Sequence, residues 1–347
     1  MTQDYCRPYD RGMSTIASTV PAVFAEQLAL FDVGLNLSKI REVRDEMMQY
    51  SQAPNTLRGY RFSWKTFANW CRETNRQALP ASPDSLSLFV IWGGVQRKPK
   101  PFKLAHVRHI VAAFKDRHRA EQLPNPMNDL VRDSLAAVAR KVEQAPGGKD
   151  ALPPEYLRRA VAGLPDNVGG VRDRAILLVG FTTGWRGDEL AGLRLNEARV
   201  FHDHVLFRLR KSKTDQEGKG REVRIPRIAG SPLCPVAALE AWIKVRGKNP
   251  GALFLPLSGG RDMKLREGTI RGKVVCAVVQ RALKRAGIKQ GNWGGHSLRS
   301  GMITAAAENG ADVISIQERT GHRRLETIAK YVRSAGGFRR DPLAGVL

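Results

Sequence analysis

The sequence predicts a mainly α-helical protein with a small antiparallel β-sheet, made of an N-terminal helical bundle and a C-terminal α+β domain. Apolar residues recur every three or four positions along most of the chain, which is typical of helices that bury one face. The alternation typical of strands occurs mainly in two segments of the second half. Residues 144–154, which contain three prolines and two adjacent glycines, are the predicted linker between the halves.

The first half is expected to fold as a helical bundle over residues 36–143, preceded by a flexible arm over residues 1–35. Its longest apolar stripe marks the buried face of one helix. The stripe consists of Leu57, Tyr60, Trp64, Phe67 and Trp70. Further helices are predicted over residues 85–95, 105–119 and 129–142, and prolines separate the last two of them.

The second half is expected to form the α+β domain over residues 155–335, followed by a C-terminal tail over residues 336–347. Alternating apolar residues predict two strands, over residues 200–209 and 222–228. The polar, glycine-containing segment between them predicts a β-hairpin with a long basic tip. The remaining helices are predicted over residues 154–164, 171–182, 234–245, 269–286, 297–309, 313–320 and 325–334.

The charge balance indicates a polyanionic partner. Lys and Arg number 57 against 33 Asp and Glu, which gives a formal net charge of +24. Such an excess repels itself, and the phosphates of nucleic acid offset it best. The four cysteines form no Cys-x-x-Cys pair, so a zinc ribbon is not expected, and no apolar run reaches membrane-spanning length. We therefore expect a protein that stays inside the cell and binds nucleic acid.

Cleavage of a phosphodiester requires a nucleophile, cationic groups that hold the phosphate oxygens, and an acid that protonates the departing oxygen. The segment over residues 183–190 supplies a candidate cation. Gly184 is expected to end one helix and Arg186 to begin the next, where its planar fork suits two phosphate oxygens. Glu189, one turn later, would hold that fork in place. Taken alone, Arg186 and Glu189 are more typical of a surface salt bridge.

Lysine and histidine side chains supply candidate proton-transfer groups. Lys211 and Lys213 lie on the predicted hairpin tip, where a lysine would reach a bound duplex and donate a proton, although a solvated basic turn is the plainer alternative. His296 and Arg299 are three residues apart at a predicted helix start, so their side chains share one face. Such a pair suits phosphate binding, and neutral imidazole accepts a proton. The alternative is a capping histidine beside an exposed arginine.

A second histidine and a tyrosine complete the set. Gly321 is expected to end one helix, which places His322 at the start of the next, and Tyr331 follows nine residues after His322. A phenol holds its proton at neutral pH, so Tyr331 would need cationic surroundings to act as a nucleophile. Otherwise it is a half-buried core residue. Each motif alone is unspecific, but the order in which they occur argues against chance.

This ordered set resembles the tyrosine recombinases, also called the phage integrase family, with a Cre-like layout over roughly residues 36–335. The resemblance is strongest over residues 183–190, 295–301 and 321–331. It implies a site-specific DNA recombinase with a helical core-binding domain that clamps DNA and an α+β catalytic domain. It also implies that the reaction needs no cofactor, metal or ATP.

The resemblance implies a role for each residue of the site. The implied catalytic residues are Arg186, Lys213, His296, Arg299, His322 and Tyr331. The two arginines and His322 would hold the scissile phosphate, with Glu189 in support. His296 would bind the phosphate or help deprotonate the tyrosine, which would form a 3′-phosphotyrosyl link. The lysine would protonate the leaving 5′ oxygen, a role that Lys211 or Lys219 would fill if Lys213 does not.

The resemblance further implies double-stranded DNA with paired half-sites as the partner, and a homotetramer on two such sites with a dimer on each. The implied DNA contacts are Arg58, Lys103, Arg108 and Arg271. The C-terminal tail would either dock into a neighbouring subunit or remain a frayed end. We expect a cytoplasmic location, on the bacterial nucleoid or on the DNA of a phage or mobile element.

Other functions fit parts of the sequence. A type IB topoisomerase or a hairpin telomere resolvase would use the same chemistry, and relaxation of DNA without a specific site would identify the first. A purely architectural DNA-binding protein would not need Tyr331. A metallohydrolase would use His202 and His204 with Asp203, but no further ligand cluster is evident in the sequence.

Overall fold

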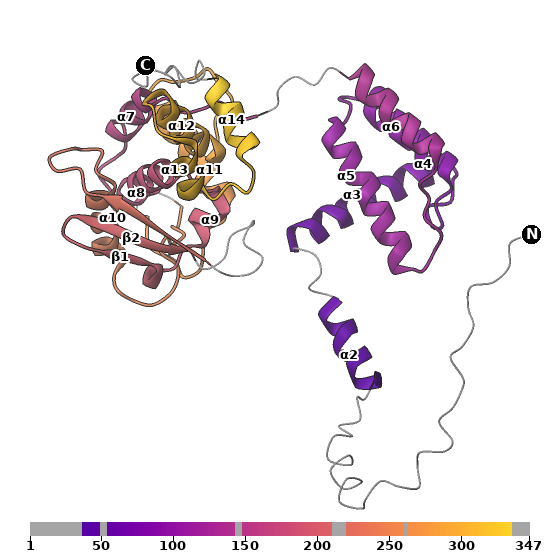
Figure 1. Cartoon of the computed structure of the whole chain (residues 1–347), viewed down its shortest axis with the longest axis horizontal. Coiled ribbons are helices and arrows are strands. Elements are labelled where there is room, and N and C mark those ends of the chain that lie inside the picture. Colours follow the sequence, from indigo (N-terminus) through magenta and orange to yellow (C-terminus); the bar gives the residue numbers. More distant parts are fainter. Residues whose placement is uncertain (1–36, 49–53, 143–147, 210–219, 260–262, 335–347) are drawn as a thin grey trace, which may run out of the picture. The chain divides into compact units, whose positions relative to one another are not determined.

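The computed structural model describes residues 37–48, 54–142, 148–209, 220–259 and 263–334. The chain divides into two units, Met1–Ala145 and Pro146–Leu347, and each is described by itself. The predicted arm over residues 1–35 and tail over residues 336–347 lie outside the described residues. The predicted fold class is confirmed, since helices dominate both units and the second unit contains a three-stranded antiparallel sheet (Figure 1).

The described part of the first unit is mainly helical. Its helices are α2 (Leu37–Met48), α3 (Pro54–Glu73), α4 (Pro83–Ile91), the π-helical turn η1 (Trp92–Gln96), α5 (Leu104–Ala120) and α6 (Asp129–Lys141). The side chain of Ser82 accepts a hydrogen bond at the start of α4, and that of Asn128 does so at the start of α6. In the structure, the helix predicted over residues 85–95 consists of α4 followed directly by η1.

An aromatic cluster forms the core of the first unit. Phe67, Phe89 and Phe114 are fully buried, and the ring centroids of Phe67 and Phe114 lie 4.3 Å apart in an edge-to-face arrangement. The predicted apolar stripe of α3 supplies part of this cluster. The opposite face of α3 is exposed and basic, as the spacing predicts, with Arg58, Arg61 and Lys65.

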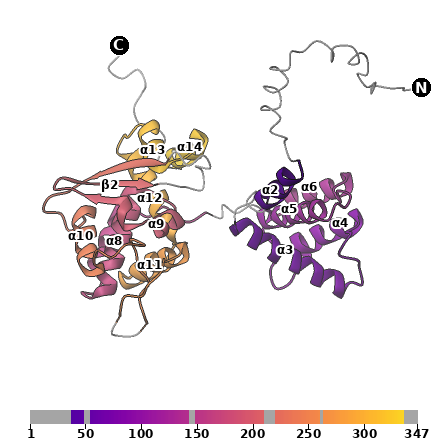
Figure 2. The ribbon, with the colours of Figure 1, turned by 90° about the horizontal axis from the view of Figure 1, so that it is seen from below.

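The central helix of the second unit is α8, which contacts α10 and α12 (Figure 2). Its helices are α7 (Pro154–Ala162), α8 (Val168–Thr183), α9 (Gly187–Gly192), α10 (Pro235–Arg246), α11 (Gly272–Arg285), α12 (Gly295–Glu308), α13 (Val313–Thr320) and α14 (Leu325–Ser334). A short 3-10 turn, η2 (Leu195–Glu197), precedes the sheet. Burial of α8 on nearly all sides explains its almost continuous apolar sequence.

The sheet consists of β1 (Ala198–Val200), β2 (His204–Leu209) and β3 (Arg221–Pro226) in that order. The prediction of one strand over residues 200–209 is wrong, because a polar turn separates β1 from β2. The backbone N–H of Phe201 donates to the carbonyl of His204 at 2.8 Å and closes this turn. β3 ends at Pro226 rather than at residue 228, because proline has no N–H for the ladder.

The second part of the predicted linker is fixed to the second unit. The backbone N–H of Asp150 donates to the carbonyl of Asn292 at 3.2 Å, and that of Leu152 donates to the carbonyl of Ser297 at 3.0 Å. Leu152 is buried in the core. These contacts attach residues 150–152 to the start of α12 and to the residues just before it. Among the described residues, no helix is both long and apolar enough to cross a membrane.

Candidate active site

The predicted catalytic side chains of the second unit come from three places in the fold. Arg186 lies between α8 and α9, His296 and Arg299 lie in the first turn or two of α12, and His322 and Tyr331 belong to the α13–α14 turn and to α14. Helix α12 contacts α8 and α14, which brings these segments together although they are far apart in sequence.

Arg186 is held by a buried carboxylate. Its Nη1 donates to Oε1 of Glu189 at 2.8 Å, and its backbone N–H donates to Oε2 at 2.9 Å. The Glu189 side chain is only 4% exposed, whereas that of Arg186 is 28% exposed. The guanidinium therefore keeps an open side toward solvent while its other side is fixed. A surface salt bridge would not bury the carboxylate in this way.

The turn before Arg186 requires glycine. Gly184 ends α8 with φ +62°, in the left-handed region. A Cβ at this position would lie 2.3 Å from Cε of Met302 and 3.0 Å from Cγ2 of Thr320. Glycine thus allows α8 to end against α12 and α13, and it leaves its carbonyl pointing at the site.

Arg299 lies at the centre of the cluster and is 1% exposed. Its Nη1 donates to the carbonyls of Gly184 at 2.7 Å and Thr320 at 2.8 Å. Its Nη2 lies 2.9 Å from Nε2 of His322. Burial, and secondly the charge of Arg186, lower the pKa of Arg299 to about 10. The alternative of an exposed arginine is therefore wrong.

His322 is fixed by the turn that ends α13. Gly321 has φ +65° and caps the helix, so that the next residue turns back toward Arg299. The hydroxyl of Thr320 lies 2.6 Å from Nδ1 of His322, and Gln317 donates to the His322 carbonyl at 2.8 Å. Burial, and secondly the charge of Arg299, lower the pKa of His322 to about 3. The imidazole is thus neutral in the DNA-free protein at neutral pH.

The tyrosine and the first histidine are in contact. Nε2 of His296 and the hydroxyl of Tyr331 lie 3.0 Å apart in a hydrogen bond. Partial desolvation of the ring, although the residue as a whole is exposed, and secondly the charge of Arg299 lower the pKa of His296 below its ordinary value. A neutral imidazole with Nε2 unprotonated accepts the phenol proton, so this pair can generate a phenolate beside the arginines.

Sequence reasoning missed Arg221, the first residue of β3. Its guanidinium lies 4.0 Å from Oε2 of Glu189 and 5.7 Å from the ring centroid of Trp185. Its charge also lowers the pKa of His322, although burial and the charges of Arg299 and Arg186 contribute more. The available signal was positional, because Arg221 shares its strand face with the apolar residues Val223 and Ile225.

The other predicted residues fall elsewhere. Lys211, Lys213 and Lys219 lie outside the described residues. Arg58 is exposed on α3 and Arg108 on α5, while Lys103 and Arg271 are exposed immediately before α5 and α11, respectively. The backbone N–H of Gly272 donates to Asp188 at 2.9 Å, which places the start of α11 beside the start of α9.

Metal ligands do not gather in the part of the chain that the structure describes, where no group of three or more His, Cys, Asp or Glu side chains could hold an ion. In the turn between β1 and β2, Asp203 lies 2.6 Å from Nδ1 of His204 and 2.8 Å from Nη2 of Arg224. Two of the three residues considered for a metallohydrolase, Asp203 and His204, thus pair with each other, and Asp203 also pairs with Arg224.

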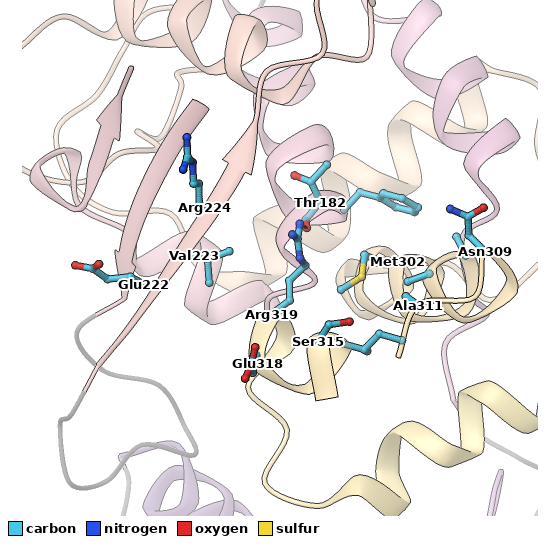
Figure 3. Close-up of a pocket in the computed structure, with 14 residues that line it drawn as sticks. Thr182, Glu222, Val223, Arg224, Met302, Asn309, Ala311, Ser315, Glu318 and Arg319 are labelled. Atoms are coloured by element: carbon cyan, nitrogen blue, oxygen red, sulfur yellow. Dashed lines mark hydrogen bonds between the residues drawn. The ribbon is translucent and has the colours of Figure 1, made fainter. Parts of the chain in front are cut away.

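A pocket of about 620 Å³ lies between β3, α8, α12 and α13. Its lining includes Thr182, Val223, Met302 and Arg319 (Figure 3). None of the predicted catalytic residues lines it.

Comparison with known proteins places the second unit in a family. Residues 151–336 match the phage integrase family. An integrase/recombinase XerD homolog of Selenomonas ruminantium is 28% identical over 303 residues, which cover 85% of this chain and 86% of that protein. Tyrosine recombinase XerD of Mycobacterium tuberculosis strain H37Rv is 31% identical over 224 residues, covering 60% of this chain and 65% of that protein.

The fold is also similar to solved structures. A lambda integrase fragment, crystallised as a dimer bound to a COC′ core site, superposes with a TM-score of 0.56 at 15% identity and covers 88% of this chain and 97% of that chain. XerH recombinase bound to a palindromic difH substrate has a TM-score of 0.53 at 18% identity, with 76% and 72% covered.

Proposed function

The chain belongs to the phage integrase family and is a tyrosine site-specific recombinase, and we propose that Tyr331 is the nucleophile with which it cleaves DNA. The observation that carries this proposal is the hydrogen bond between Tyr331 and His296, next to the buried pair of Arg299 and His322. A phenol, a neutral base and fixed cations thus lie in one place. The architectural DNA-binding protein considered above would need no such arrangement.

In the proposed reaction, the Tyr331 oxygen attacks phosphorus while His296 accepts its proton. Arg186, Arg299 and His322 hold the non-bridging oxygens, on which charge builds in the transition state. The 5′ oxygen leaves and takes a proton from Lys213, or from Lys211 or Lys219 in its place. The bond that forms is a 3′-phosphotyrosyl link, which replaces one phosphodiester by another and conserves its energy. Attack by a 5′ hydroxyl of a second strand then reseals the DNA, so neither ATP nor a metal is needed.

Each cation contributes in a different way. Arg186 is partly exposed and keeps donors free on the side away from Glu189, so it is suited to contact the phosphate directly. Nη1 of Arg299 donates to two carbonyls, which fixes the plane of the guanidinium, and Nη2 beside His322 is the group that would contact the phosphate. The site is therefore organised before DNA arrives, which is the condition for electrostatic catalysis.

We further propose double-stranded DNA with paired half-sites as the substrate and a homotetramer on two sites as the active assembly. Lambda integrase has been crystallised as a dimer on a core site and as a tetramer on a Holliday junction, which supports this proposal. Arg58, Lys103, Arg108 and Arg271 are proposed DNA contacts, and their exposure supports this role. We also propose that the protein acts in the cytoplasm.

The test uses a nicked suicide duplex, in which the strand released by cleavage diffuses away. The duplex would carry a site selected by binding from a random library. We expect a covalent protein–DNA adduct on denaturing gels with the wild type and none with Tyr331→Phe. Tyr156→Phe, on α7, is the matched control and should form the adduct normally. An adduct that survives Tyr331→Phe would remove the nucleophile assignment.

A further inference from the structure

The side chain of Arg221 enters the active site from the sheet. Burial alternates along β3, with Val223 and Ile225 buried and Glu222 and Arg224 exposed. Because side chains of a strand alternate between faces, Arg221 points to the same side as the buried pair. It is therefore the strand residue that faces the catalytic cluster, whereas Arg224 pairs with Asp203 on the surface.

Arg221 packs beneath the turn that presents His322. A Cβ on Gly321 would lie 2.0 Å from Nη1 and 2.7 Å from Cζ of Arg221. The guanidinium thus fills the space under this turn, and only glycine fits above it. The ring of Trp185, the residue before Arg186, lies on another side at 5.7 Å. Arg221 therefore touches both segments that carry phosphate-binding residues.

The hydrogen-bonding capacity of Arg221 is unused. Its Nε, Nη1 and Nη2 are buried, and none has a hydrogen-bond partner in the part of the chain that the structure describes. By contrast, Arg186 and Arg299 both donate to fixed acceptors. A buried guanidinium without acceptors is costly, and it persists where charge or position is required.

The cations of the site share one buried carboxylate. Oε1 of Glu189 accepts from Arg186, while Oε2 lies 4.0 Å from Nη2 of Arg221. When the Arg186 fork engages a phosphate, less of its positive charge neutralises the Glu189 carboxylate. A small movement would let Arg221 donate to Oε2 and supply that positive charge instead. Its nitrogens are too buried to contact DNA themselves.

Resting on the proposed function, we propose that Arg221 is a positioning residue for DNA cleavage. It holds Glu189 and the Gly321 turn so that Arg186 and His322 meet the same phosphate. Its effect should therefore fall on the rate of the chemical step at saturating DNA, not on the affinity for DNA.

The test measures single-turnover adduct formation on the suicide duplex together with the Kd of DNA binding. We expect Arg221→Gln to react about tenfold slower or more at saturating DNA, since misplacement of phosphate ligands acts on the chemical step. Its Kd should stay within about twofold of the wild-type value. Arg221→Lys, which keeps the charge but not the fork, should react at an intermediate rate. The matched control is Arg224→Gln, the same change on the opposite face of β3, and it should react normally.

A wild-type rate in Arg221→Gln, or a loss explained entirely by weaker DNA binding, would overturn the proposal. If Arg221→Gln does not fold, Arg221→Lys decides alone, because it must then show a slower rate with unchanged affinity. Wild type and Tyr331→Phe are run in parallel. An adduct in Tyr331→Phe, or none in wild type, would refute the proposed nucleophile. Failure of the Arg221 proposal is distinguishable from this, because it shows only in the Arg221 variants.

Discussion

Replacement of Gly321 by alanine should damage the site through the backbone, without removing any catalytic group. Gly321 has φ +65°, a conformation that costs a residue with a Cβ about 1–2 kcal/mol. The new methyl would also lie 2.0 Å from Nη1 of Arg221, so the turn or the guanidinium must move. Overpacking of this kind costs about 1–3 kcal/mol.

The two contributions together predict a loss of about 2–5 kcal/mol in unfolding free energy. For a unit of this size that corresponds to a fall in Tm of roughly 4–20 °C. Because the displaced turn carries His322, the rate of DNA cleavage should also fall, by about a hundredfold for a displacement of 1 Å.

Gly310 provides the matched control. It has φ +78°, and a Cβ there would meet no atom within 4 Å. Gly310→Ala should therefore cost only the backbone contribution, about 1–2 kcal/mol, and leave the cleavage rate unchanged. The assays are urea denaturation and adduct formation on the suicide duplex at saturating DNA. Equal stability losses in the two variants, with normal cleavage by Gly321→Ala, would refute the reasoning.

Three further predictions follow from the site and the charge. Glu189→Gln removes the carboxylate that holds Arg186, so we expect slower adduct formation and about 1–3 kcal/mol less stability in urea denaturation; an unchanged rate would contradict the role given to Glu189. The pKa of His322 is lowered to about 3, so between pH 6.5 and 3 the unfolded chain binds a proton that the folded protein does not, and stability should be complete above pH 6.5 and decline below it. The urea midpoint should fall less between pH 7 and 5 in His322→Gln than in wild type, and equal slopes would count against this. DNA binding should weaken steeply with salt, because many phosphates are contacted, and a flat titration would exclude an extended basic interface.

Local signals in the sequence predict much of the fold. Glycines at Gly184 and Gly321 mark helix ends correctly, because the left-handed conformation after a helix favours glycine whatever the tertiary context. Apolar spacing likewise locates α3 and the central helices. The break between β1 and β2 was missed, although Val200 and Val205 are five residues apart and so out of phase with the two-residue alternation of a single strand.

The candidate site was predicted in part. Residue types and their order pointed to Arg186, His296, Arg299, His322 and Tyr331, and the structure brings these side chains together, while their roles stay predictions. Burial could not be predicted, because it depends on contacts distant in sequence.

Arg299 illustrates this limit. It is enclosed by the carbonyls of Gly184 and Thr320, which come from two other helices. Arg221 went unnoticed for the same reason, since its neighbours Glu189 and Gly321 belong to separate segments.

The most direct test of the proposed chemistry is the identity of the residue that becomes attached to DNA. The adduct trapped on a suicide duplex would be digested with protease and nuclease, and the peptide that retains a nucleotide would be sequenced by mass spectrometry. The proposed mechanism predicts a 3′-phosphate carried on the oxygen of Tyr331. A nucleotide on any other residue would contradict it, even if Tyr331 proved necessary for activity.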